Sequence, residues 1–266
     1  MLRSVALKML HDQWRILAVW SVLAAILAAF YLSLYPSIGS VDEMRRLLDA
    51  MPPELRAMFS IEGADLGTPA GYLNMELFTF MLPLIVAAVT VTAGSGATAG
   101  EEERGTLELL LANPIGRWRI VVEKALGGAL LSGALCAGVW IGLAIVASAI
   151  AVDLALGRVA AALVSVWLLG AVIGAVALLV GALTGNRTLA IGTGLTVAVV
   201  GFFVNALAPL TDVLEPWQPL SPHYHYLGYD PLTRGLDFGH AAVLAVTAVV
   251  LTLLAALAFE RRDLRA

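Results

Sequence analysis

The feature that most constrains this chain is a set of long apolar runs that contain no charged residue. Two of them, residues 77–99 and 125–152, are separated only by a short, highly charged stretch. A helix needs about 20 apolar residues to cross the hydrocarbon core, where every backbone polar group must be hydrogen-bonded within the protein. Charged residues make up 14% of the chain and the mean hydropathy is +0.88, whereas soluble domains carry about 25% charged residues. The sequence therefore predicts an all-α integral membrane protein.

Six stretches are long and apolar enough to be spans, namely residues 16–35, 77–99, 125–152, 159–183, 189–210 and 239–259. The whole chain, residues 1–266, then forms one transmembrane domain with outer loops at 36–71 and 211–238. Placing both termini, the 100–124 loop and the 184–188 turn in the cytoplasm puts 11 of the 16 Lys and Arg residues inside and 12 of the 20 acidic residues outside. This distribution agrees with the positive-inside tendency. We expect a multi-pass protein of the cell membrane with both termini cytoplasmic.

Small residues indicate how the spans pack. The pairs Gly138/Gly142, Gly170/Gly174 and Gly181/Gly185 have the spacing that lets helix backbones approach closely, and we expect them to join spans of this one chain. Residues 184–188 predict a tight turn between two spans, and Pro83 predicts a kink in the second span.

The charged stretch carries most of the functional information. Residues 101–119 hold four Glu (Glu101, Glu102, Glu103, Glu108) and three Arg (Arg104, Arg117, Arg119). Such a segment must lie in water at a membrane face. Residues 101–112 are mostly good helix formers interrupted by Gly105, and Leu107, Leu110 and Leu111 would share one face. Pro114 ends that helix and Arg117 begins the next. The pattern predicts an amphipathic helix lying across the cytoplasmic face, although a simple solvated connector is an alternative.

This stretch resembles a known family. Residues 100–114 (GEEERGTLELLLANP), followed by Arg117, Arg119 and Lys124, are similar to the cytoplasmic loop after the second span of type-2 ABC transporter permeases, the six-span subgroup without a fused ATPase. The Arg-rich residues 259–265 resemble the usual C-terminus of that family. The resemblance implies that the loop carries a coupling helix that binds the ATP-binding subunit.

The resemblance also implies partners and site residues. We expect two copies of an ABC ATP-binding subunit, a second permease chain as homo- or heterodimer, and the lipid bilayer, but no nucleic acid. ATP and Mg would be bound by the ATPase, with no cofactor in this chain. The coupling residues would be Glu101, Glu102, Glu103, Gly105, Thr106, Leu107, Glu108, Leu110, Leu111, Pro114 and Arg117. Since Glu101 and Glu108 would lie in water, replacing either with lysine should uncouple transport and leave the fold intact.

Several functions are disfavoured by what the sequence lacks. It has no phosphate-binding loop and no H-E-x-x-H or G-x-S-x-G motif, so we predict that the chain is not itself an enzyme. The spans lack the buried Asp, Glu, Lys and His residues typical of ion-driven carriers. A membrane scaffold or sensor that binds a cytoplasmic protein remains an alternative, as does a stand-alone channel.

The cargo is predicted only as a class. Glu76, Phe78, Phe80, Met81, Phe202 and Phe203 could line a path suited to an outward-moving hydrophobic or amphipathic molecule, or they could pack in the core. An ion or a small sulfur- or metal-bearing species is an alternative cargo in the resembled family. No resident metal is predicted, because His223 and His225 lack a close third ligand in the sequence.

Overall fold

The computed structural model describes residues 5–37, 50–52, 67–107 and 116–262. Every element in this part of the chain is helical. The longer helices are α1 (Val5–Leu34), α5 (Met81–Ala97), α8 (Arg117–Ala149), α9 (Leu156–Thr184), α10 (Arg187–Leu207) and α13 (Phe238–Arg261). The shorter ones are η1 (Tyr35–Ser37), α4 (Pro69–Leu73), η2 (Asn74–Phe78), α6 (Ala99–Glu103), η3 (Ala208–Leu210), η4 (Glu215–Leu220), α11 (Pro222–Leu227) and α12 (Pro231–Arg234).

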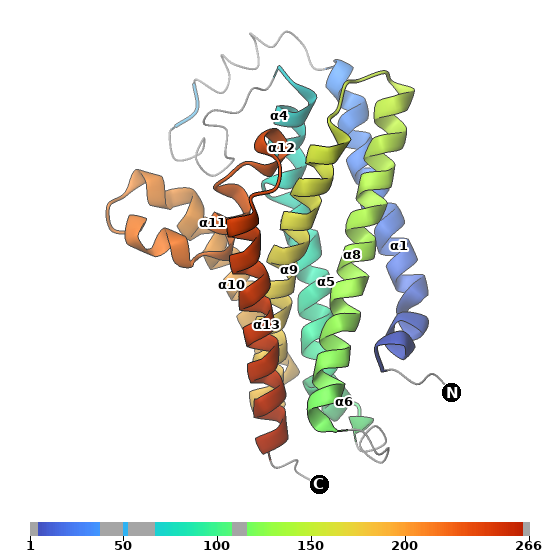
Figure 1. Cartoon of the computed structure of the whole chain (residues 1–266), viewed down its shortest axis with the longest axis vertical. Coiled ribbons are helices and arrows are strands. Elements are labelled where there is room, and N and C mark those ends of the chain that lie inside the picture. The colour runs from blue at the N-terminus through green and yellow to red at the C-terminus, as the bar shows by residue number, and fades with distance from the viewer. Residues whose placement is uncertain (1–4, 38–49, 53–66, 108–115, 263–266) are drawn as a thin grey trace.

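The long helices run side by side along the longest axis of the molecule, with α9 in the middle (Figure 1). In its most apolar stretch, 61% of α9 is buried inside the protein, compared with 22% of α13. The outer faces carry exposed apolar side chains such as Val246, Val249 and Leu253 of α13. Exposed apolar surface of this extent suits helices that contact lipid. α1 begins and α13 ends toward the end of the bundle that carries α6 (Figure 1).

Within the described ranges, four helices are long and apolar enough to cross a membrane: α8, α9, α10 extended by η3, and α13. A fifth span results if the bent pair formed by residues 69–78 and 81–97 counts as one. α1 contributes a shorter apolar stretch, Ala18–Leu34. The all-helical, multi-pass prediction is confirmed at this level, and the sixth span stays a prediction.

The predicted kink of the second span lies upstream of the proline that signals it. The two halves meet at an angle of 41° around Thr79 and Phe80, and Pro83 lies in the first turn of α5. A proline ring clashes with the carbonyl four residues earlier, which here belongs to Thr79. The helix therefore breaks at Thr79, where the Oγ1 atom is buried without a hydrogen-bond partner.

Two of the predicted glycine pairs join helices of this chain, as expected. A Cβ atom on Gly142 would lie 2.8 Å from the Ala25 carbonyl oxygen of α1, and one on Gly174 would lie 2.8 Å from Thr90 Cβ of α5. The tightest approach to a backbone atom involves Gly94, whose Cβ would lie 2.3 Å from the carbonyl oxygen of Gly174. The α5–α9 contact is thus a backbone-to-backbone contact that tolerates no added atom.

The segment predicted as an outer loop at 211–238 folds into short helices that lie toward the end of the bundle away from α6, with the η4 region projecting to the side (Figure 1). Ser221 Oγ donates to the Gly201 carbonyl at 2.6 Å, and Tyr226 Oη donates to the Phe78 carbonyl at 2.7 Å. His225 and His240 join α11 to α13, with their Nδ1 atoms 3.0 Å apart. The segment is therefore a fixed cap on one end of the bundle.

Candidate functional site

The charged stretch begins as a short helix rather than the predicted continuous one. α6 ends at Glu103, and Gly105 adopts a left-handed conformation with a φ of +67°. Glycine reaches that region without steric cost, so the residue that interrupts the helical pattern is where the chain turns. The prediction of a single helix over residues 101–112 is thus wrong for its first part. Four predicted coupling residues lie outside the described residues: Glu108, Leu110, Leu111 and Pro114.

Each glutamate of α6 is paired with a cation from a different helix. Glu101 accepts from Lys124 of α8 at 2.6 Å, and Glu102 accepts from Arg262 at the end of α13 at 2.6 Å. Glu103 lies 3.7 Å from Arg187, the first residue of α10. Three consecutive carboxylates therefore connect the short helix to three membrane-spanning helices.

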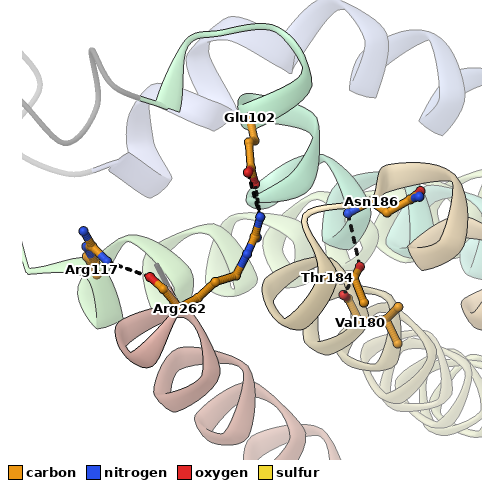
Figure 2. Close-up of polar contacts among 6 residues, drawn as sticks. All are labelled: Glu102, Arg117, Val180, Thr184, Asn186 and Arg262. Carbon is orange, nitrogen blue, oxygen red and sulfur yellow. Dashed lines mark hydrogen bonds and ion pairs between the residues drawn. The ribbon is translucent and has the colours of Figure 1, made fainter. Parts of the chain in front are cut away.

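The Glu102 pair lies at a junction of several elements (Figure 2). Arg262 Nη2 donates to both carboxylate oxygens of Glu102, at 2.6 and 2.8 Å, while the Arg262 carbonyl accepts from Arg117 Nη1 at 3.1 Å. The guanidinium of Arg117 thus binds the carbonyl of the residue that follows α13, at a helix C-terminus, where a cation is favoured. A Cβ atom on Gly185 would lie 2.0 Å from Arg262 Nη2, so the pair rests directly on a residue without a side chain.

The turn beneath this pair follows from its sequence. Gly185 has a φ of +67° and ends α9 in the left-handed conformation common at helix C-termini. Asn186 Oδ1 then accepts from the Leu189 backbone N–H at 2.9 Å and caps α10. Figure 2 shows Thr184 Oγ donating to Val180 and accepting from the Asn186 N–H. The predicted tight turn is confirmed.

The Glu101 pair is the most enclosed of the three. The exposed fractions of the Lys124 and Glu101 side chains are 7% and 19%, and Thr106 Oγ1 also donates to the Glu101 carboxylate. Burial by itself raises the pKa of Glu101, but the hydrogen bonds from Lys124 and Thr106 outweigh it, so the pKa lies below its usual value. The premise that Glu101 lies in water is wrong, because α8 supplies a cation that draws it inward. Glu101→Lys should therefore destabilise the fold in addition to uncoupling transport.

Leu107 is also inside the protein. It is buried with residues of four other helices in an apolar cluster below α6, formed by Ala97, Val121, Leu178, Ala182, Ala255, Ala256 and Phe259. Its predicted contact with a partner is therefore indirect, because its side chain is already covered by this chain. Leu107 anchors the end of the α6 segment to α5, α8, α9 and α13.

Among the predicted coupling residues that the structure describes, only some are open to a partner. Glu103, Arg104 and Gly105 are exposed at the tip of the segment, and Trp118 and Arg119 are exposed on the first turn of α8. Glu102, Thr106 and Arg117 are partly covered. The exposed tip, defined as Glu103, Arg104 and Gly105, thus projects from a base that is held by ion pairs.

The sequence analysis did not assign Lys124, Arg187 or Arg262 to the site. Two signals pointed to them. Lys124 lies seven positions after Arg117, so both side chains extend from one face of α8. Arg187 and Arg262 flank apolar helices and need acidic partners when partly buried, which the three consecutive glutamates provide.

The residues predicted to line a path divide into two groups. Phe80, Phe202 and Phe203 form an aromatic cluster, with ring centroids 5.4 Å apart for Phe80–Phe202 and 5.6 Å apart for Phe202–Phe203. Phe80 and Phe203 are 47% and 40% exposed. Phe78, by contrast, is 1% exposed and belongs to the core, so its side chain does not line a path in this structure. Met81 packs against that core and Glu76 is partly buried on η2.

His223 completes the aromatic cluster from the cap of the bundle. Its ring centroid lies 5.9 Å from that of Phe202, and it is 3% exposed. Burial lowers the pKa of His223 to about 4, so the imidazole is neutral at physiological pH. The cluster therefore carries no charge from this residue.

Comparison with known families agrees with this arrangement. A family model described as an ABC-2 family transporter protein matches residues 4–264. Since the match covers nearly the whole sequence, the chain belongs to the ABC-2 transporter family. It is thus a multi-pass membrane protein of a family whose members are transport subunits that work with an ATP-binding partner. No curated protein matches the sequence at a significant level.

Proposed function

We propose that this chain is the permease subunit of an ABC exporter, and that a separate ATP-binding subunit docks on the exposed tip. One observation carries the proposal. The tip is exposed at one end of the bundle, yet α6 is tied by ion pairs to α8, α10 and α13. Force applied at the tip is thereby delivered to three helices at once, which a simple solvated connector does not need.

The proposed topology has six spans with α1 as the first. Both termini and α6 would then lie in the cytoplasm, and the short helices from η3 to α12 would lie outside the cell membrane. The excess of Lys and Arg on the α6 side supports this orientation.

A second permease chain is proposed to pack on α10. This helix leaves a shallow hollow of about 510 Å³ on its exposed side, lined by Asn186, Thr188, Leu189, Gly192, Thr193, Thr196 and Val197. Small and hydroxyl-bearing residues are enriched where membrane helices meet, and lipid chains offer their polar atoms no partner. The functional unit would then be a permease dimer with two ATPase subunits, which bind ATP and Mg.

The proposed mechanism is mechanical. ATP-driven closure of the two ATPases would move both α6 segments, and Lys124, Arg187 and Arg262 would transmit that movement to α8, α10 and α13. The dimer would alternate between inward- and outward-open arrangements, with ATP shifting the balance.

A hydrophobic or amphipathic cargo is the class that the described residues favour. Phe80 and Phe203 are large, partly exposed aromatic side chains, and both contact the ring of Phe202. The neighbouring His223 is neutral. Aromatic surfaces of this kind bind apolar groups and would give an ion no compensating charge.

The tip can be tested by charge reversal. In purified complex, Glu103→Arg should weaken ATPase-subunit binding by about tenfold, because truncating or reversing an interface charge costs on the order of 1–2 kcal/mol. The dissociation constant is measured by titrating the ATPase subunit onto the reconstituted permease. The fold should stay intact, since the Glu103 side chain is 61% exposed and its ion pair is long.

Asp212→Arg provides the matched control. Asp212 is exposed at the opposite end of the bundle and undergoes the same change of charge. We expect unchanged ATPase binding in this variant. Equal affinities for Glu103→Arg, Asp212→Arg and the wild-type protein would contradict docking at the tip.

A further inference from the structure

A groove at the α6 end of the bundle, between α9 and α13, is not used by the proposed coupling mechanism. It has a volume of about 460 Å³ and is lined by Leu183, Leu254, Leu257, Ala258, Arg261 and Arg262. The three leucines are each about half exposed, at 57%, 47% and 51%. The groove is thus apolar along its length, with both arginines at the end of α13.

The position of the groove on the molecule determines what can fill it. α13 is the least buried of the four long apolar helices α8, α9, α10 and α13, so we take its outward side to face the bilayer. Leu254 and Leu257 lie within the last two turns of α13, and Arg261 is in its final turn. The groove therefore runs from the hydrocarbon core to the headgroup region, with its apolar residues in the core and its arginines at the headgroups.

The arginines are only partly satisfied by the protein. Arg261 is exposed, and Arg262 uses Nη2 for Glu102 while its Nη1 atom is buried without a hydrogen-bond partner. Arg117 adds a third guanidinium at this end of α13, through its bond to the Arg262 carbonyl. Among the described residues of this end, Glu102 and the exposed Glu260 stand against these three cations. The mouth of the groove is thus positively charged.

We propose that this groove binds an anionic phospholipid from the surrounding leaflet. One acyl chain lies along Leu183, Leu254 and Leu257, and the phosphate binds the exposed guanidinium of Arg261, with the charge of Arg262 nearby. Basic pockets beside membrane-spanning helices are suited to anionic headgroups, and each nearby arginine strengthens binding about fivefold.

The test uses the purified full chain in detergent and native mass spectrometry, with palmitoyl-oleoyl phosphatidylglycerol and phosphatidylcholine as probes. The two lipids share their acyl chains and differ in headgroup charge. We expect phosphatidylglycerol to be retained at higher occupancy. Arg261→Gln should lower its affinity about fivefold and leave phosphatidylcholine unchanged, because one headgroup cation is lost while the apolar groove is kept.

Two variants locate the effect. Ala258→Phe, which fills the groove, should reduce retention of both lipids. Arg158→Gln is the matched control, since Arg158 is an exposed arginine in the first turn of α9 at the opposite end, and it should change neither lipid. Equal retention of the two lipids by the wild-type protein would overturn the proposal, as would equal effects of Arg261→Gln and Arg158→Gln. Displacement of phosphatidylglycerol by inorganic phosphate would also overturn it and indicate a simple anion site.

Discussion

Gly94→Ala is expected to destabilise the protein by about 3 kcal/mol, the upper end of the usual cost of overpacking a core. The added methyl group would lie 2.3 Å from the Gly174 carbonyl oxygen and 3.1 Å from the Leu178 backbone nitrogen, and neither backbone atom can rotate away as a side chain could. The α5 and α9 helices would have to separate, and α9 is the central helix of the bundle. The measurement is the temperature at which the detergent-solubilised protein loses its monodisperse state.

Gly96→Ala is the matched control on the same helix. A Cβ atom at this position meets nothing within 4 Å, so the substitution adds a methyl group without a clash. Alanine favours a helix over glycine by up to about 1 kcal/mol, which should leave this variant as stable as the wild type or slightly more so. Equal losses of stability in the two variants would show that the α5–α9 contact is not as close as described.

Glu101→Ala is expected to cost on the order of 3 kcal/mol. The substitution removes the carboxylate that lies 2.6 Å from Lys124, whose side chain is 7% exposed, and buried ion pairs are strongly destabilised when one partner is lost. Glu103→Ala makes the same chemical change two residues further along α6, where the side chain is 61% exposed, and should cost about 0.5 kcal/mol or less. Thermal stability of both variants in detergent measures the difference.

Two further readouts show whether the Glu101 effect comes from the ion pair. The double variant Glu101→Ala with Lys124→Met should lose less stability than the sum of the single variants. The pKa of Glu101 is lower in the folded protein than its usual 4.5, so the stability from this group is present above pH 4.5 and lost as the pH falls below it. Glu101→Ala should abolish that part of the acid sensitivity. Additive effects, or an unchanged acid profile, would contradict the pair.

Much of the fold could be predicted because hydropathy and glycine spacing act locally. Most of the uncharged run at 125–152 lies within α8, which ends at Ala149, and the run at 159–183 lies within α9. The turn at Gly185 and Asn186 follows from two residues with strong preferences at helix ends. The break at Thr79 was placed too late at Pro83, because a proline acts on the carbonyl four residues before it.

The site was harder to predict because its contacts join residues distant in sequence. Glu102 and Arg262 are 160 positions apart, and no periodicity in either segment indicates that they meet. A row of glutamates also looks like a solvated surface when the cations that neutralise it lie on other helices. For the same reason Leu107 was assigned to a partner surface, although residues of four other helices cover it.

The most direct test of the account is purification of this chain in mild detergent from cells that express it naturally, followed by quantification of whatever remains bound. The account predicts an ABC ATP-binding subunit in a one-to-one ratio with the permease, whose ATP turnover changes when Glu103→Arg is introduced. Recovery of the chain without an ATPase, alone or with a different cytoplasmic protein, would contradict the account and favour a channel or a membrane scaffold.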